Sequence, residues 1–146
     1  MSAWLFDVNV LIALLDIAHS HHPAAREWFR ERQAPAWATC PITEIGFVRV
    51  VSDRKYSAGL MPAAAADLLA RFKSSHRDTH NWWPDEVSLT DGSLFRLDVL
   101  LGAKQVTDAY LLGLAFRKGG RLASFDRSLP WQVVRGASPK LIETIR

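Results

Sequence analysis

Short apolar runs that alternate with longer stretches of helical periodicity restrict the fold of this chain more than any other feature. Residues 3–6 form one apolar run, which stops at Asp7, and residues 121–125 form a second candidate strand, which stops at Asp126. Such short runs are typical of strands that are buried on both faces of a parallel sheet. Because helical stretches separate them, the sequence predicts an α/β fold with three layers, in which helices cover both faces of a mostly parallel central sheet.

The same pattern gives the expected order of elements. We expect strands at residues 3–6, 35–38, 80–83, 121–125 and 139–145. We expect helices at residues 10–16, 23–32, 41–51, 61–72, 93–101 and 107–118. Pro23 and Pro62 lie at expected helix starts, and Gly119 and Gly120 follow an expected helix end, which are the positions where these residue types are favoured.

The composition indicates one folded domain over residues 1–146. Hydrophobic residues make up 49% of the chain and charged residues 23%, a balance that supplies a core and excludes a disordered chain. The single cysteine, Cys40, excludes a disulfide scaffold and agrees with a reducing compartment. The sequence contains no linker, repeat, targeting segment or membrane span, so we expect a cytoplasmic protein that does not contact a membrane.

Four acidic residues sit where a simple solvated carboxylate is not expected. Asp7 and Asp126 each follow an expected strand. Ligands bind beyond the carboxyl ends of parallel strands, so these two acids could lie at one binding site, although each could instead cap the next helix. Glu44 and Asp108 each share the apolar face of a helix. An inward carboxylate needs a cation, which for Glu44 could be a distant Arg or Lys. Asp98 is a competing acid that ranks second, as a structural partner or an outer residue of the site.

Four converging carboxylates would repel one another, so they predict a divalent cation. Oxygen ligands favour Mg²⁺ or Mn²⁺. Zinc is disfavoured because there is one cysteine and because His19, His21 and His22 are bunched in one loop, where they could instead border a substrate groove. The sequence has no nucleophile elbow, Walker loop or dinucleotide-binding motif.

Four short motifs surround these acids. In chain order they are Asp7-Val8-Asn9-Val10-Leu11, Thr43-Glu44, Val106-Thr107-Asp108-Ala109 and Ser124-Phe125-Asp126. Together they resemble PIN-domain ribonucleases, in particular the VapC-type toxins of bacterial toxin–antitoxin pairs, over nearly the whole chain. The resemblance implies a PIN-like fold and a Mg²⁺-dependent endoribonuclease that cleaves RNA such as tRNA, rRNA or mRNA. It also implies a cognate antitoxin that blocks the site, and commonly a homodimer.

The resemblance assigns roles to individual residues of this chain. The metal-binding and catalytic acids would be Asp7, Glu44, Asp108 and Asp126. The polar residues that support them would be Asn9, Thr107 and Ser124.

An RNA substrate requires positive charge around such an acidic centre. The formal net charge is +3, and setting the four acids aside leaves a larger basic excess on the rest of the chain. Arg127, next to Asp126, and Arg49 are candidate substrate-binding residues. Trp82 and Trp83 could stack on unpaired bases, or pack in the core or a dimer interface.

Two other functions remain open from the residues alone. A phosphatase with Asp7 as its nucleophile would suit an acid after the first strand, but position 9 is Asn and breaks the usual D-x-D pattern. A non-catalytic module would bind RNA or protein without metal-dependent cleavage.

Overall fold

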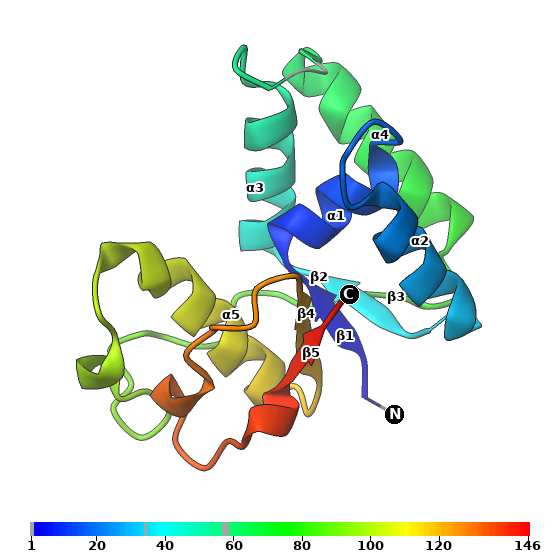
Figure 1. Ribbon diagram of the computed structural model, residues 1–146. Coiled ribbons are helices and arrows are strands. Elements are labelled where there is room, and N and C mark those ends of the chain that lie inside the picture. Colours follow the sequence, from blue (N-terminus) through cyan, green and yellow to red (C-terminus); the bar gives the residue numbers. More distant parts are fainter. Residues whose placement is uncertain (1, 34, 57–58) are drawn as a thin grey trace.

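A parallel five-stranded sheet forms the centre of the computed structural model, which describes residues 2–33, 35–56 and 59–146 (Figure 1). The strands are β1 (Trp4–Phe6), β2 (Trp37–Thr39), β3 (His80–Trp82), β4 (Arg121–Ser124) and β5 (Ile142–Thr144). They lie in the order β3-β2-β1-β4-β5, and every neighbouring pair is parallel. The parallel sheet predicted from the short apolar runs is therefore confirmed, and β1 lies at its middle.

Helices cover both faces of this sheet. They are α1 (Val8–Leu15), α2 (His22–Glu31), α3 (Pro41–Val51), α4 (Pro62–Ser75) and α5 (Val106–Arg117). Figure 1 shows α1 to α4 grouped on one side of the strands and α5 on the other. Side chains of alternate strand residues point to opposite faces, so Leu5 and Leu122 join the core under α5, whereas Phe6 and Ala123 join the core under α1 to α4. The three-layer α/β/α prediction is confirmed.

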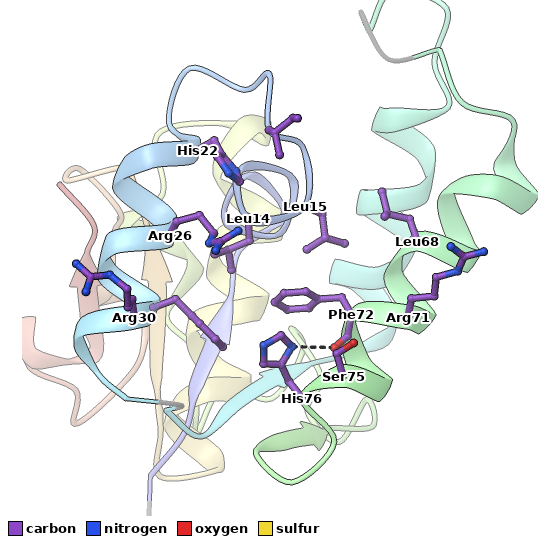
Figure 2. Close-up of a pocket in the computed structure, with 12 residues that line it drawn as sticks. Leu14, Leu15, His22, Arg26, Arg30, Leu68, Arg71, Phe72, Ser75 and His76 are labelled. Atoms are coloured by element: carbon purple, nitrogen blue, oxygen red, sulfur yellow. Dashed lines mark hydrogen bonds between the residues drawn. The ribbon is translucent and has the colours of Figure 1, made fainter.

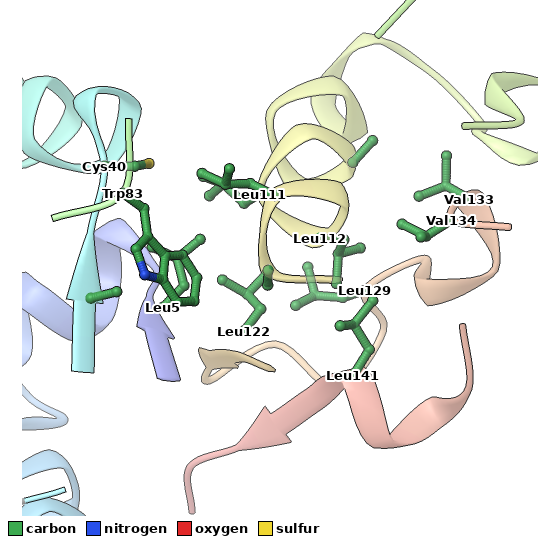
Figure 3. Packing of buried hydrophobic residues seen from close by; sticks show 14 of the residues in the cluster. Leu5, Cys40, Trp83, Leu111, Leu112, Leu122, Leu129, Val133, Val134 and Leu141 are labelled. Atoms are coloured by element: carbon green, nitrogen blue, oxygen red, sulfur yellow. The ribbon is translucent and has the colours of Figure 1, made fainter. Parts of the chain in front are cut away.

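The core on the α5 side is built from segments far apart in the chain (Figure 3). Leu111 and Leu112 of α5 are fully buried, and they belong to one cluster with Leu122 of β4 and the C-terminal residues Val133 and Leu141. Cys40 and Trp83 are buried in the same cluster. Burial raises the pKa of the Cys40 thiol, which fits a packing role rather than that of a nucleophile.

Local chemistry explains where the site-bearing helices begin and end. The Asp7 carboxylate caps α1 by accepting a hydrogen bond from the Val8 N–H. The helix α3 has Pro41 in its first turn, and the Thr43 hydroxyl accepts a bond from the Cys40 N–H. After α5 the chain turns at Gly119, whose φ of +70° favours glycine.

The helix predicted at residues 93–101 is wrong. Leu94 and Phe95 are buried, and a 3₁₀ turn at Leu97–Val99 follows them. Phe95 instead forms an isolated antiparallel bridge with Val134. The Arg96 N–H also donates to the Val133 carbonyl at 2.8 Å. Long-range pairing with the C-terminal segment therefore replaces the local helix that the apolar spacing suggested, and Asp98 lies in the 3₁₀ turn instead.

Other boundaries differ by a few residues from those expected. The second strand begins at Trp37 instead of residue 35, β3 ends before Trp83, and α4 continues to Ser75. Residues 139–141 form a 3₁₀ turn that leads into β5. Among the described residues, no helix is both long enough and apolar enough to span a membrane.

Candidate active site

Asp7 and Asp126 lie at the same edge of the sheet because β1 and β4 are parallel neighbours. Ser124, the buried last residue of β4, connects the two acids. Its hydroxyl donates to Asp7 Oδ2 at 2.9 Å and accepts a bond from the Asp126 N–H at 3.1 Å. The other Asp7 oxygen, Oδ1, accepts from the Val8 N–H at 2.8 Å. Both oxygens of Asp7 are thus fixed by the folded chain, and the supporting position predicted for Ser124 agrees with this geometry.

Asp108 reaches the same edge from the first turn of α5. Burial raises its pKa to about 6, and the charges of Asp7 and Asp126 contribute to the shift. The pKa of Asp7 is also raised, mainly by burial and in part by Asp126, against the opposing hydrogen bonds from Ser124 and Val8. These three carboxylates therefore form one electrostatic unit, as the positions of Asp7, Asp108 and Asp126 in the sequence predicted.

Glu44 makes its contacts with residues of β2 and α4. Its Oε2 accepts a hydrogen bond from the Thr39 hydroxyl at 2.7 Å and pairs with Lys73 Nζ at 2.7 Å. Burial and the nearby Lys73 charge lower the pKa of His80, against an opposing effect of Glu44, and His80 Nε2 lies 2.8 Å from Thr39 Oγ1. The distant cation that the sequence left open as a partner for Glu44 is therefore Lys73, from the last turn of α4.

Sequence reasoning missed the residues around Glu44. Thr39 ends β2 and so carried the same strand-end signal as Asp7, which could have identified it. No sequence pattern identified His80 or Lys73. His80 reaches Thr39 because β3 pairs with β2, and Lys73 reaches Glu44 because α4 packs against α3.

The remaining predicted site residues lie at the surface. Asn9 and Thr107 are exposed near Asp7 and Asp108 in the chain, and Arg127 is exposed directly after Asp126. Arg49 is exposed on α3, where it borders a shallow apolar groove with Ile45. Asp98 is exposed in a 3₁₀ turn. Nothing in its surroundings connects it to the acids of the site within the described residues.

The three histidines of the predicted loop have separate contacts. His22 Nδ1 lies 2.7 Å from the Ala13 carbonyl at the end of α1, and His19 Nδ1 accepts from the His21 N–H at 3.0 Å. The His21 ring stacks on Phe125, with 4.6 Å between the ring centroids. Phe125 directly precedes Asp126, so His21 contacts the neighbour of that acid in the chain.

The donor chemistry of the acidic site suits a hard divalent cation. Asp7, Asp108 and Asp126 offer oxygen ligands only, and no basic side chain of the described residues contributes to the raised pKa of Asp7 or Asp108. The side chains nevertheless stand apart: within residues 2–33, 35–56 and 59–146, no three His, Cys, Asp or Glu side chains already surround one ion position.

A separate groove lies between α1, α2 and α4 (Figure 2). It has a volume of about 630 Å³, and its apolar lining includes Leu14, Phe29 and Phe72. Arg26, Arg30 and Arg71 border it. The groove opens beside the last turn of α1, whereas Asp7 precedes the first turn, so the two features are different parts of the surface.

The amino-acid sequence of this chain is similar to those of several known proteins. Ribonuclease VapC44 of Mycobacterium tuberculosis is 43% identical over 141 residues, which are 97% of this chain and 98% of the relative. Ribonuclease VapC39 of the same organism is 43% identical over 142 residues, with the same coverage of 97% and 98%. Ribonuclease VapC38 is 42% identical over 125 residues, or 84% of each chain. No family model matches the chain.

Proposed function

The chain belongs to the VapC family of ribonucleases, and from this premise we propose that it is a metal-dependent endoribonuclease that acts as the toxin of a toxin–antitoxin pair. One observation carries the proposal: Asp7, Asp108 and Asp126 form an electrostatic unit at the carboxyl edge of the sheet, in a chain 43% identical to ribonucleases over 97% of its length. The alternatives of a phosphatase or a non-catalytic module are not favoured, because the relatives are named ribonucleases.

Asp7, Asp108 and Asp126 would hold the cation, with Glu44 as a fourth ligand or as the residue that orients water. When bound, Mg²⁺ or Mn²⁺ stabilises charge on the phosphodiester and activates water for attack in line with the leaving oxygen. The chain itself positions the ligands: the Val8 N–H and the Ser124 hydroxyl fix the orientation of Asp7. The Ser128 N–H and hydroxyl both donate to Asp126 Oδ1, which leaves Oδ2 of that residue for the ion.

The same residues explain why RNA would not bind without a cation. Three neighbouring carboxylates repel a phosphodiester, and burial together with charge repulsion raises the pKa values of Asp7 and Asp108. We propose that Arg127 and Arg49, both exposed, contribute to binding the RNA backbone, and that Asn9 and Thr107 support the acids from the adjoining chain.

We further propose that a cognate antitoxin binds the groove between α1, α2 and α4. Its apolar lining accepts the apolar face of a helix, and the arginines that border it favour acidic flanking residues on that helix. An antitoxin seated there would need an extension toward Asp7 to block the acidic site. Homodimerisation and a cytoplasmic location remain predictions of the family; light scattering of the purified protein tests the first.

The test is cleavage of purified total RNA, with new ends mapped by sequencing, in Mg²⁺ and in excess EDTA. We expect cleavage only with Mg²⁺, and loss of cleavage in Asp7→Asn and Asp108→Asn. The matched control is Asp98→Asn, which removes an exposed carboxylate and should cleave as the unmodified protein does. Cleavage that persists in EDTA, or in either site variant, contradicts the proposal, and a phosphoenzyme trapped on Asp7 would favour a phosphatase instead.

A further inference from the structure

Two adjacent tryptophans at the end of β3 have opposite surroundings. Trp83 is 7% exposed and packs in the core under α5, whereas Trp82, the last residue of β3, is 50% exposed. The core interpretation therefore accounts for Trp83 but not for Trp82. Half of the Trp82 side chain is thus accessible to a ligand at the carboxyl edge of the sheet, where Asp7 and Asp126 lie.

The register of the sheet places Trp82 beside the acidic site. Trp82 pairs with Thr39, the last residue of β2, so both lie at the carboxyl edge. The strand β3 lies two strands away from β1, which is a separation of roughly 10 Å at the usual strand spacing of about 4.8 Å. This distance corresponds to one or two nucleotides along an extended single strand that crosses the edge from Asp7 toward β3.

Lys73 connects Trp82 to Glu44. Its Nζ pairs with Glu44 Oε2 at 2.7 Å and lies 5.4 Å from the centroid of the Trp82 ring, within the range of a cation–π contact. The Lys73 side chain remains 29% exposed. An ammonium group has three donors, so Lys73 can donate to a phosphate oxygen.

We propose that Lys73 and Trp82 form a nucleotide-binding subsite on the β3 side of the acidic site, in which the Trp82 indole stacks on an unpaired base and Lys73 pairs with the adjoining phosphate. The subsite rests on the proposed ribonuclease function, since it would hold the substrate next to the scissile bond. It takes single-stranded RNA, because a base already stacked in a duplex cannot stack on the indole without leaving its neighbours. Stacking on an aromatic side chain tolerates any base, so the subsite gives affinity for unpaired RNA rather than for one sequence.

Binding must be measured apart from cleavage. We would use the cleavage-deficient Asp7→Asn protein in Mg²⁺ and a fluorescein-labelled, unstructured RNA oligonucleotide, with anisotropy as the readout. Trp82→Ala should weaken binding by about 5-fold to 150-fold, the range that corresponds to the loss of one stacked base, and Trp82→Phe should restore most of it. Lys73→Gln should weaken binding and reduce the dependence of log Kd on log salt by about one. A fully paired RNA duplex should bind all variants alike.

Two variants serve as matched controls. Phe116→Ala removes another exposed aromatic side chain, near the C-terminal end of α5 at the opposite edge of the sheet, and Lys118→Gln removes a lysine that also pairs with a glutamate, Glu86. Neither should change the affinity for single-stranded RNA by more than about twofold. Circular dichroism verifies that each variant is folded.

The outcomes separate the subsite from the proposed function. Unchanged affinity in both Trp82→Ala and Lys73→Gln, in a protein that cleaves RNA with Mg²⁺ before Asp7 is changed, overturns the subsite alone. Absence of metal-dependent cleavage overturns the proposed function, whatever the binding data are. A change of oligomeric state in Trp82→Ala with no change in RNA affinity would show that the exposed indole contacts a second copy of the chain, and it too overturns the subsite.

Discussion

Replacing Asp108 with asparagine should stabilise the ion-free protein, because the folded chain holds this carboxylate against repulsion. Its pKa is raised to about 6 from an ordinary value of 3.8, by burial and by the charges of Asp7 and Asp126. Each pKa unit corresponds to 1.36 kcal/mol, so the ionised group costs at most about 3 kcal/mol of folding free energy. Asp108 is only partly buried, and screening by water reduces the expected gain to about 1–2 kcal/mol.

The sign of the pH dependence follows from the direction of the shift. The folded state binds the Asp108 proton more tightly than the unfolded chain does, so the cost is fully present above the folded pKa of about 6 and disappears as the pH falls toward the unfolded value. Asp108→Asn should therefore raise the free energy of unfolding near pH 7.5, and the difference from the unmodified protein should shrink to near zero at about pH 4.

Urea denaturation in EDTA at both pH values measures this difference, with Asp98→Asn as the control. The control removes an exposed acid and should change stability by no more than about 0.5 kcal/mol at either pH. Adding Mg²⁺ should stabilise the unmodified protein more than Asp108→Asn, because the ion binds the folded state through the carboxylate that the variant lacks. A gain of the same size at both pH values, or no gain near pH 7.5, would refute the electrostatic reasoning.

Three further predictions concern other contacts. Ser124→Ala removes a hydrogen bond that lowers the pKa of Asp7. The acidic limb of the pH profile of kcat/KM should therefore move to higher pH. If this limb stays at the same pH, the bond does not set the ionisation of Asp7. Gly113→Ala would put a Cβ atom 2.1 Å from Phe95 Cζ, so it should lower the free energy of unfolding, measured by urea denaturation, by about 1–3 kcal/mol. Gly92→Ala is the control, because its Cβ atom would meet open space. Arg26→Glu should weaken antitoxin binding at least about tenfold at low salt and less at high salt, and a salt-independent effect would argue against an acidic partner.

Much of the fold was predictable because its signals are local. The strands β1 and β4 are largely buried and read as short apolar runs, and the acids that follow them lie at the edge where ligands bind. This reasoning applied to Asp7 and Asp126, while helix faces selected Glu44 and Asp108, and the charges of Asp7, Asp108 and Asp126 act on one another.

The errors come from interactions that join distant segments. Residues 93–101 have helical apolar spacing, but Phe95 packs over Gly113 and pairs with Val134, and neither contact can be read from the nine residues themselves. The partner of Glu44 was likewise invisible, because Lys73 lies 29 positions later in the chain and approaches only when α4 packs against α3. Hydrophobic periodicity identifies which face of a helix is buried, but it does not identify which residues of other segments pack against that face.

In the ion-free protein, Glu44 is stabilised by its ion pair with Lys73, whereas the other three acids have no such partner among the contacts described above. Asp7, Asp108 and Asp126 repel one another, so binding a cation relieves a cost that the fold already bears. Glu44 has a cation at 2.7 Å, so joining the same ion would require it to exchange Lys73 for the metal. We therefore propose that the first three acids supply the affinity for the ion. The contribution of Glu44 depends on what Lys73 gains on release, and a substrate phosphate beside Trp82 would provide that compensation. On this reasoning, substrate and metal bind more tightly together than separately, and substituting Lys73 should weaken that coupling more than it weakens metal binding alone.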